Sequence, residues 1–77
     1  MKRIEEPVVV EARKGWPVLL RRCGKTYRVL RQLDFWVVQG RWWMQEEKRV
    51  YFRVRTDRGV LELYNSRGEW VLSRLFD

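Results

Sequence analysis

The sequence predicts a small all-β domain, built as an SH3-like barrel or as a rolled antiparallel meander of six to seven short strands. Apolar and polar side chains alternate with a period of two in several short segments, as strand side chains do on opposite faces of a sheet. Glycine-containing turns separate these segments, and no segment has the spacing of an amphipathic helix. An OB-like barrel is the second choice, because that fold more often carries a helix between its third and fourth strands.

The alternation is clearest in residues 49–56, where one face is apolar and the other is cationic. The inward positions of this strand are Val50, Phe52, Val54 and Thr56, and the outward ones are Arg49, Tyr51, Arg53 and Arg55. Asp57-Arg58-Gly59 follows as a three-residue hairpin loop, in which Gly59 supplies a positive φ. These residues predict a hairpin with the strand that begins at Val60.

The N-terminal part of the chain predicts a tail and two strands. Residues 1–6 are charged and are expected to form a disordered tail, so that a single domain spans residues 7–77. In the first strand, up to Arg13, the inner face takes Val8, Val10 and Ala12. The turn Lys14-Gly15 leads to a second strand over residues 16–23, which ends in a turn at residues 23–25.

The middle of the chain predicts a bent strand. Its alternation over residues 26–33 breaks at Leu30-Arg31, where a β-bulge restores the phase and adds the bend that closure of a small barrel requires. Residues 34–39 are apolar on both faces, which indicates a strand buried on both sides or a covered edge. Residues 44–48 favour a short helical turn or a wide loop.

The last third of the chain predicts two more strands, over residues 60–64 and from residue 69 to about residue 75, with a turn at residues 65–68. A chain of 77 residues has room for one core. Its single cysteine, Cys23, excludes an internal disulfide, fits a reducing cytoplasm and is expected to be a buried or half-buried apolar residue.

The net charge and the length of the apolar runs limit the kinds of partner that the protein can have. A net charge of +7 favours attraction to polyanions or to an acidic protein surface. No apolar run approaches the ~20 residues of a membrane span, and the first residues are charged rather than signal-like. We therefore expect a cytoplasmic protein with no membrane contact.

Catalytic chemistry has few residues to use. The chain has no histidine, so the lone cysteine has no imidazole to activate it and metal ligation lacks its commonest ligand. The five glycines are isolated turn residues and form no phosphate-binding loop. The sequence predicts a protein that is not an enzyme and takes no metal or cofactor.

The aromatic residues indicate a binding surface. Phe35-Trp36, Trp42-Trp43 and Tyr51-Phe52 are adjacent pairs, and a regular strand cannot bury both members of a pair against one core. Tyr51 points outward among arginines, a combination that single-strand nucleic-acid platforms use for stacking and phosphate contacts. The candidate binding residues are Arg41, Trp42, Trp43, Arg49, Tyr51, Arg53 and Arg55.

A second interpretation of the same residues needs no ligand. Tyr51 and one of Trp42 and Trp43 would cover a minor core beneath residues 44–48. The arginines would then form a solvated face paired with glutamates, each pair contributing only ~0.2–1 kcal/mol. The glutamates in question are Glu46, Glu47 and Glu62.

Three stretches of the chain carry a resemblance to known proteins: Gly40-Arg41-Trp42-Trp43, residues 49–54, and Trp70-Val71-Leu72 with Phe76-Asp77. In these, and over most of its length from Pro7 onward, the chain resembles a family of small uncharacterised bacterial proteins, catalogued as a domain of unknown function. Similar modules close the C-terminus of the Y-family-polymerase-like subunit of bacterial mutagenic translesion cassettes. The resemblance implies a setting in DNA damage tolerance, through DNA or a polymerase partner, and transfers no catalytic residue.

Together these observations predict a non-catalytic binding module whose basic-aromatic β surface contacts single-stranded or duplex nucleic acid. The alternatives are a protein-interaction module for a polymerase or replication protein, and a purely structural small barrel with no ligand. Salt separates the first two, because affinity for nucleic acid falls steeply with salt whereas an interface built on exposed aromatic residues is far less sensitive.

Overall fold

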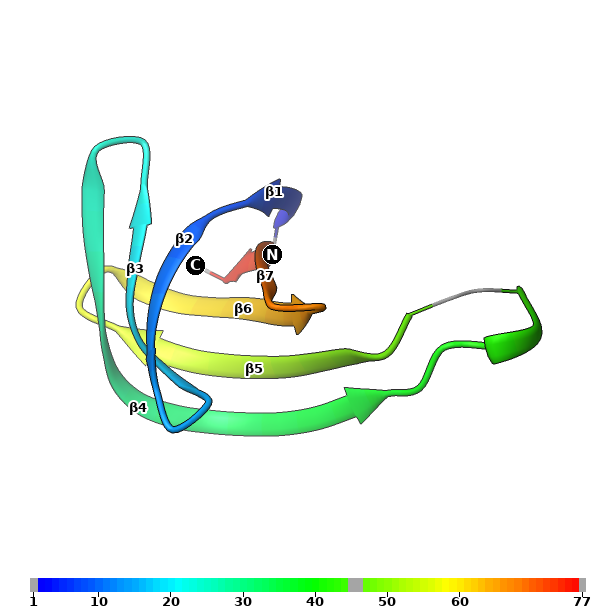
Figure 1. The fold of residues 1–77 in the computed structure, drawn as a ribbon. Coiled ribbons are helices and arrows are strands. Elements are labelled where there is room, and N and C mark those ends of the chain that lie inside the picture. Colours follow the sequence, from blue (N-terminus) through cyan, green and yellow to red (C-terminus); the bar gives the residue numbers. More distant parts are fainter. Residues whose placement is uncertain (1, 45–46, 77) are drawn as a thin grey trace.

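The chain folds into one curled antiparallel sheet of seven strands, which a computed structural model describes for residues 2–44 and 47–76 (Figure 1). The all-β prediction and the upper strand number are therefore confirmed. A 3₁₀ turn, η1, spans Trp42–Met44 between the fourth and fifth strands. The strands are β1 Lys2–Pro7, β2 Val9–Arg13, β3 Trp16–Arg22, β4 Lys25–Val38, β5 Arg49–Thr56, β6 Gly59–Ser66 and β7 Glu69–Phe76.

The sheet is a rolled meander, as predicted. Strands β2 to β7 lie side by side in chain order, and β1 lies on the far side of β7. The two outermost strands, β1 and β2, follow each other directly in the chain. Val8 joins them, and its backbone N–H donates to the carbonyl oxygen of Trp70 at 3.1 Å. One continuous N-terminal segment thus pairs with β7 through its first half and with β3 through its second, which rolls the sheet into a barrel-like form.

The core lies inside the roll and follows the predicted alternation of β5. Phe52 and Val54 are buried, whereas Arg49 and Arg55 are exposed and Tyr51 and Arg53 are partly exposed. Burying such side chains contributes about 1.5–3 kcal/mol each, so a short strand with four inward positions is strongly held in its phase. The buried core cluster consists of Leu20, Tyr27, Phe52, Val54, Leu61, Leu63 and Leu72.

The long strand β4 belongs to both halves of the roll. Its first four residues pair with β3, and residues from Val29 to Val38 pair with β5. The pairing register shifts between Val29 and Arg31, and the intervening Leu30 is 64% exposed. The predicted bulge is therefore confirmed, and a second shift between Gln32 and Asp34 adds to the bend.

The N-terminal segment differs from the expected disordered tail. Lys2–Pro7 forms β1, which pairs with β7 from Lys2 opposite Leu75 to Pro7 opposite Val71. Ile4 packs against the core, and the Glu6 carboxylate accepts a 2.7 Å hydrogen bond from Arg22. The charged residues that suggested a disordered tail therefore belong to a paired strand, and Glu6 among them bonds to Arg22.

Two side chains and one segment differ from the expectations for burial. Cys23 is exposed, because it occupies a tight turn with a φ of 51° that points it away from the core. Ala12 is exposed, since the register shifts between Glu11 and Ala12 and reverses its phase. Residues 34–39 are not buried on both sides, since Phe35, Val37 and Val38 are close to half exposed, and no described strand covers their second edge.

The remaining local predictions concern turns. The loop between β5 and β6 is shorter than the predicted three residues, because Gly59 pairs with Thr56 as the first residue of β6 and leaves Asp57-Arg58 as the loop. Gly59 has the expected positive φ, +118°. A helical turn or a wide loop was expected at residues 44–48, and the 3₁₀ turn at Trp42–Met44 overlaps this range only at Met44. Gln45 and Glu46 lie outside the described residues. No helix in the described ranges is long and apolar enough to cross a membrane.

Candidate functional site

The side of strands β4 to β7 that faces away from the core, here called the outer face, carries a row of aromatic rings. Cross-strand pairing aligns Trp36 of β4, Tyr51 of β5 and Tyr64 of β6. The rings of Trp36 and Tyr51 are almost parallel, with an interplanar angle of 4° and centroids 5.2 Å apart, and Tyr64 lies 5.1 Å beyond Tyr51. Tyr51 thus points outward as predicted, but its ring faces are covered by its neighbours.

Arg49 lies over this aromatic row. Its guanidinium carbon is 4.5 Å from the centre of the Tyr64 ring, and its Nη1 donates to the Tyr51 hydroxyl at 3.3 Å. The hydrogen bond to Tyr51 raises the pKa of Arg49 above its ordinary value. Tyr64 is nearly buried and donates to the Glu5 carboxylate at 3.1 Å. Its burial, together with this hydrogen bond, raises the pKa of Tyr64.

Arg53 belongs to a charged cluster centred on Glu62, which is only 3% exposed. The Glu62 carboxylate lies 3.4 Å from Arg53 Nη2 and 3.6 Å from Arg74 Nε, and it accepts a 3.1 Å hydrogen bond from the Ser73 hydroxyl. The Arg53 guanidinium also lies 4.9 Å from the Phe76 ring centre. The Arg53–Glu62 ion pair that the second interpretation requires is therefore present. The Arg53 guanidinium thus already has contacts with Glu62 and Phe76 within the chain.

Arg55 has a different environment from Arg53. It lies directly opposite Arg31 in the β4–β5 pairing, and both side chains are exposed. Neither forms an ion pair with any carboxylate of the described residues. Like charges placed directly opposite each other across two strands destabilise a sheet. This Arg31/Arg55 pair is the feature of the outer face that the fold itself does not need.

Arg31 was absent from the residues predicted from the sequence. Its alignment with Arg55 depends on the bulge at Leu30, which moves the outward phase of β4 by one position. The break in alternation at Leu30-Arg31 was the available signal. Strand pairing, which decides which arginine Arg31 meets, could not be obtained from that signal.

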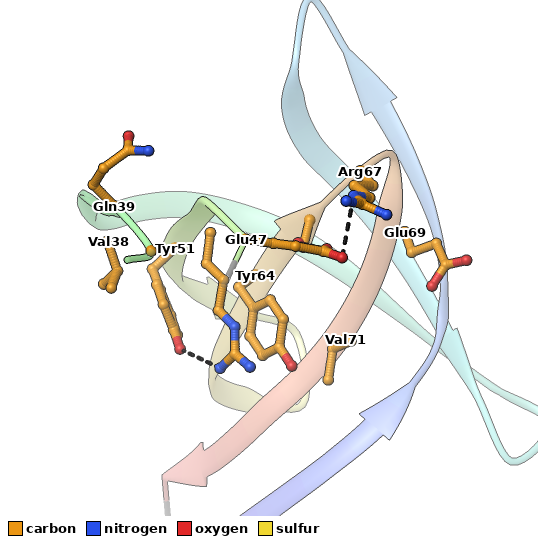
Figure 2. Close-up of a pocket in the computed structure, with 11 residues that line it drawn as sticks. Val38, Gln39, Glu47, Tyr51, Tyr64, Arg67, Glu69 and Val71 are labelled. Carbon is orange, nitrogen blue, oxygen red and sulfur yellow. Dashed lines mark hydrogen bonds and ion pairs between the residues drawn. The ribbon is translucent and has the colours of Figure 1, made fainter. Parts of the chain in front are cut away.

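An open groove of about 800 Å³ lies beside the aromatic row (Figure 2). Tyr51, Tyr64 and Val71 line it, and an ion pair of 3.1 Å joins Glu47 to Arg67 at one side. Glu69 adds a further carboxylate to the lining. Because acidic and basic groups are mixed here, the groove is a weaker candidate for a polyanion than the Arg31/Arg55 pair.

The other candidate residues lie on a projecting arm, residues 39–44, which extends from the end of β4 away from the rolled sheet (Figure 1). Trp43 is 66% exposed, and Arg41 Nη1 lies 3.7 Å from the sulfur of Met44. The side chain of Trp42 is outside the described part of the structure. Of the predicted residues, four share the outer face of β5, namely Arg49, Tyr51, Arg53 and Arg55, and the arm holds Arg41 and Trp43 apart from them.

Across residues 2–44 and 47–76, no three His, Cys, Asp or Glu side chains gather closely enough to hold a metal ion. The chemistry that the described surface offers is that of guanidinium groups, exposed rings and backbone edges. No family model matches this chain, and neither does any curated protein or solved structure.

Proposed function

We propose that this protein is a non-catalytic module that binds nucleic acid through the outer face of β4 and β5. The observation that carries the proposal is the Arg31/Arg55 pair, two exposed like charges set directly opposite each other without a carboxylate partner among the described residues. A phosphate between the two guanidinium groups would turn their repulsion into two charge-assisted contacts.

The surroundings of this pair support the same partner. Arg53 lies next to Arg55 on the outward side of β5 and is only partly neutralised by Glu62, which it shares with Arg74. The net charge of +7 adds a long-range attraction that raises the rate of encounter with a polyanion. Arginine suits phosphate because its planar guanidinium donates two parallel hydrogen bonds.

The aromatic row limits the mode of binding. Since the faces of Tyr51 are covered by Trp36 and Tyr64, bases do not stack on this row. Binding through arginine and phosphate alone reads no sequence, so we propose an interaction that is independent of sequence and strongly dependent on salt. The setting in DNA damage tolerance, implied by the family resemblance, remains part of this proposal and fits a surface that takes DNA of any sequence.

The test is a titration of the intrinsic tryptophan fluorescence with single-stranded and duplex oligonucleotides at about 0.05 M and about 0.2 M salt. The wild type should bind at the lower salt and bind much more weakly at the higher. The double variant Arg31→Gln/Arg55→Gln should lose most of this affinity. As a matched control, Arg13→Gln/Lys25→Gln removes the same charge from two exposed positions on β2 and at the start of β4, and it should bind almost as the wild type does.

Two results would overturn the proposal. One is the absence of binding to either oligonucleotide at low salt. The other is an equal loss of affinity in both double variants, which would show a general charge effect instead of a site at the Arg31/Arg55 pair.

A protein partner is the second candidate, and the exposed side chains of Trp43 and Met44 on the projecting arm favour it. A polymerase or replication protein bound through these side chains would be held mainly by apolar contact. Its affinity would change little between the two salt concentrations. Pull-down with the wild type and with Trp43→Ala, in the presence of nuclease, distinguishes this candidate from binding bridged by nucleic acid.

A further inference from the structure

The far half of β4 has a neighbouring strand on one side only. Residues 25–28 pair with β3 and residues from Val29 onward pair with β5, so no strand of the described chain pairs with the other side of residues 34–38. Figure 1 shows this half of β4 along the margin of the sheet, with β5 beside it. Alternate N–H and C=O groups of such an edge point away from the sheet and are available to another strand.

This edge lacks the features that normally prevent strand pairing. Natural edges carry charged residues, prolines or bulges, yet residues 35–40 contain none of the first two, and both register shifts of β4 precede Phe35. Phe35 and Val37 are 47% and 46% exposed. An uncharged, apolar and regularly paired edge is therefore open over at least the length of a short strand.

The apolar surface continues from the edge to the mouth of the roll. Phe35 packs against Trp16 and Phe52, with ring centroids 5.2 Å and 5.4 Å away. Phe52 belongs to the buried core, whereas Trp16 is 42% exposed. The rings thus lead without interruption from the core to the open side of β4, so a strand added there would extend the hydrophobic core.

We propose that this edge pairs antiparallel with the same edge of a second copy, about a two-fold axis at Val37. The charges favour that axis, since it opposes Asp34 to Gly40 and brings no two like charges together over residues 33–41. An axis one residue earlier would oppose Arg31 to Arg41. A C₂ interface of this kind uses the same surface on both copies and leaves no open end.

The arm makes this arrangement self-complementary. Leu30 and Met44 each lie seven positions from Val37, on opposite sides, so a two-fold axis at Val37 brings the arm of one copy toward Leu30 of the other. Both side chains are more than half exposed. The bulge at Leu30 and the projecting arm thereby become parts of a single interface.

The exposed area is sufficient for a small stable interface. Taking about 200 Å² for each ring side chain, Trp16, Phe35 and Trp43 together expose roughly 300 Å² per copy. Two copies contribute about 600 Å² from these rings alone, and the aliphatic side chains and the strand backbone raise the total past the ~1,000 Å² that specific interfaces require. Each copy carries a net charge of +7, so added salt should strengthen the dimer, whereas it should weaken nucleic-acid binding.

Sedimentation equilibrium of the full chain tests the proposal. We expect a species of twice the 9.6 kDa chain mass, whose fraction increases with protein concentration and with salt. Val37→Lys places two ammonium groups together at the axis and should sediment as a monomer. Val9→Lys introduces the same charge at an exposed position of β2 and should remain dimeric. Circular dichroism and urea unfolding check that both variants are folded.

Cross-linking covers the case in which Val37→Lys fails to fold. In a Cys23→Ser background, Val37→Cys should form an intermolecular disulfide on mild oxidation, and Val9→Cys should not. The proposal is overturned if the wild type stays monomeric at every salt and concentration, if it forms open-ended oligomers, or if both cysteine variants cross-link equally. Oligonucleotide binding by a monomeric Val37→Lys variant would leave the proposed function intact, so the two proposals fail separately.

Discussion

At the scale of single residues, Glu62 shows how the outer face tolerates so many arginines. Its buried carboxylate lies between Arg53 and Arg74 and accepts a hydrogen bond from Ser73. A buried carboxylate stabilises a fold only while its partners remain, and both arginine side chains here are more than a third exposed, which weakens each pair through solvent screening. Glu62 is therefore best understood as a structural counter-charge beneath the cationic face.

Glu62→Gln should lower the free energy of unfolding by about 1–2 kcal/mol, because it leaves two arginines without their counter-charge while retaining the side-chain size. Urea unfolding followed by tryptophan fluorescence measures this loss. Glu11→Gln removes an exposed carboxylate 3.8 Å from Arg21 and should change stability by less than about 0.5 kcal/mol. Equal effects of the two substitutions would show that the Glu62 cluster has no special role.

Tyr64 makes stability depend on pH in the alkaline range. Burial and the Glu5 carboxylate raise the pKa of Tyr64, so the folded state keeps the phenol neutral at a pH where the unfolded state ionises. This contribution is fully present below about pH 10, the unfolded value, and is lost as the pH rises through the raised folded pKa. Between about pH 8 and about pH 11 the wild type should therefore lose more stability than Tyr64→Phe does.

Urea midpoints at the two pH values measure this difference. Tyr51→Phe keeps Tyr64 and serves as the control, since it should retain the wild-type loss. If Tyr64→Phe lost as much stability as the wild type over this range, the phenol would not be the group responsible.

At the scale of elements, β5 and β4 show what the sequence could predict. The inward and outward positions of β5 follow from alternation alone, since Val50, Phe52 and Val54 are apolar and the residues between them are arginine or tyrosine. The bulge in β4 was predicted because Arg31 would otherwise point inward. Periodicity describes a single strand, however, and says nothing of which strand lies beside it, so the open edge of β4 and the Arg31/Arg55 pair emerged only from the structure.

The N-terminal strand β1 is the element for which the prediction from composition, a disordered tail, was wrong. Lys2, Arg3, Glu5 and Glu6 resemble a solvated tail, but β1 is held by long-range partners that no local pattern reveals. Its contacts are the pairing with β7, the packing of Ile4 and the bonds of Glu5 and Glu6 to Tyr64 and Arg22.

Deletion of residues 2–6 should therefore destabilise the protein by several kcal/mol or unfold it, because it removes a strand together with one core contact of about 1.5–3 kcal/mol. Thermal unfolding followed by circular dichroism measures the effect. The variant Lys2→Gln/Arg3→Gln keeps the strand, removes two charges and should unfold close to the wild-type temperature. A deletion variant as stable as the wild type would restore the view that these residues form a dispensable tail.

At the scale of the whole molecule, the two surfaces of the chain divide its roles. The interior of the roll holds the core, and the rings of the aromatic row contact one another on the outer face. What remains is a cationic area at Arg31 and Arg55 and an apolar edge on β4, for which we propose two kinds of binding with opposite responses to salt. The predicted binding site combined aromatic rings with arginines. In the present proposal the rings pack against one another, and the arginines alone contact the partner.

The salt dependence of the association constant for a single-stranded oligonucleotide tests the central claim most directly. For the wild type, the logarithm of this constant should fall linearly with the logarithm of the salt concentration. Arg31→Gln/Arg55→Gln should make that slope shallower by about 0.7, since the two arginines share one phosphate and each neutralised phosphate on a single strand contributes about 0.7. An unchanged slope in the double variant would contradict the claim that these two arginines contact phosphate.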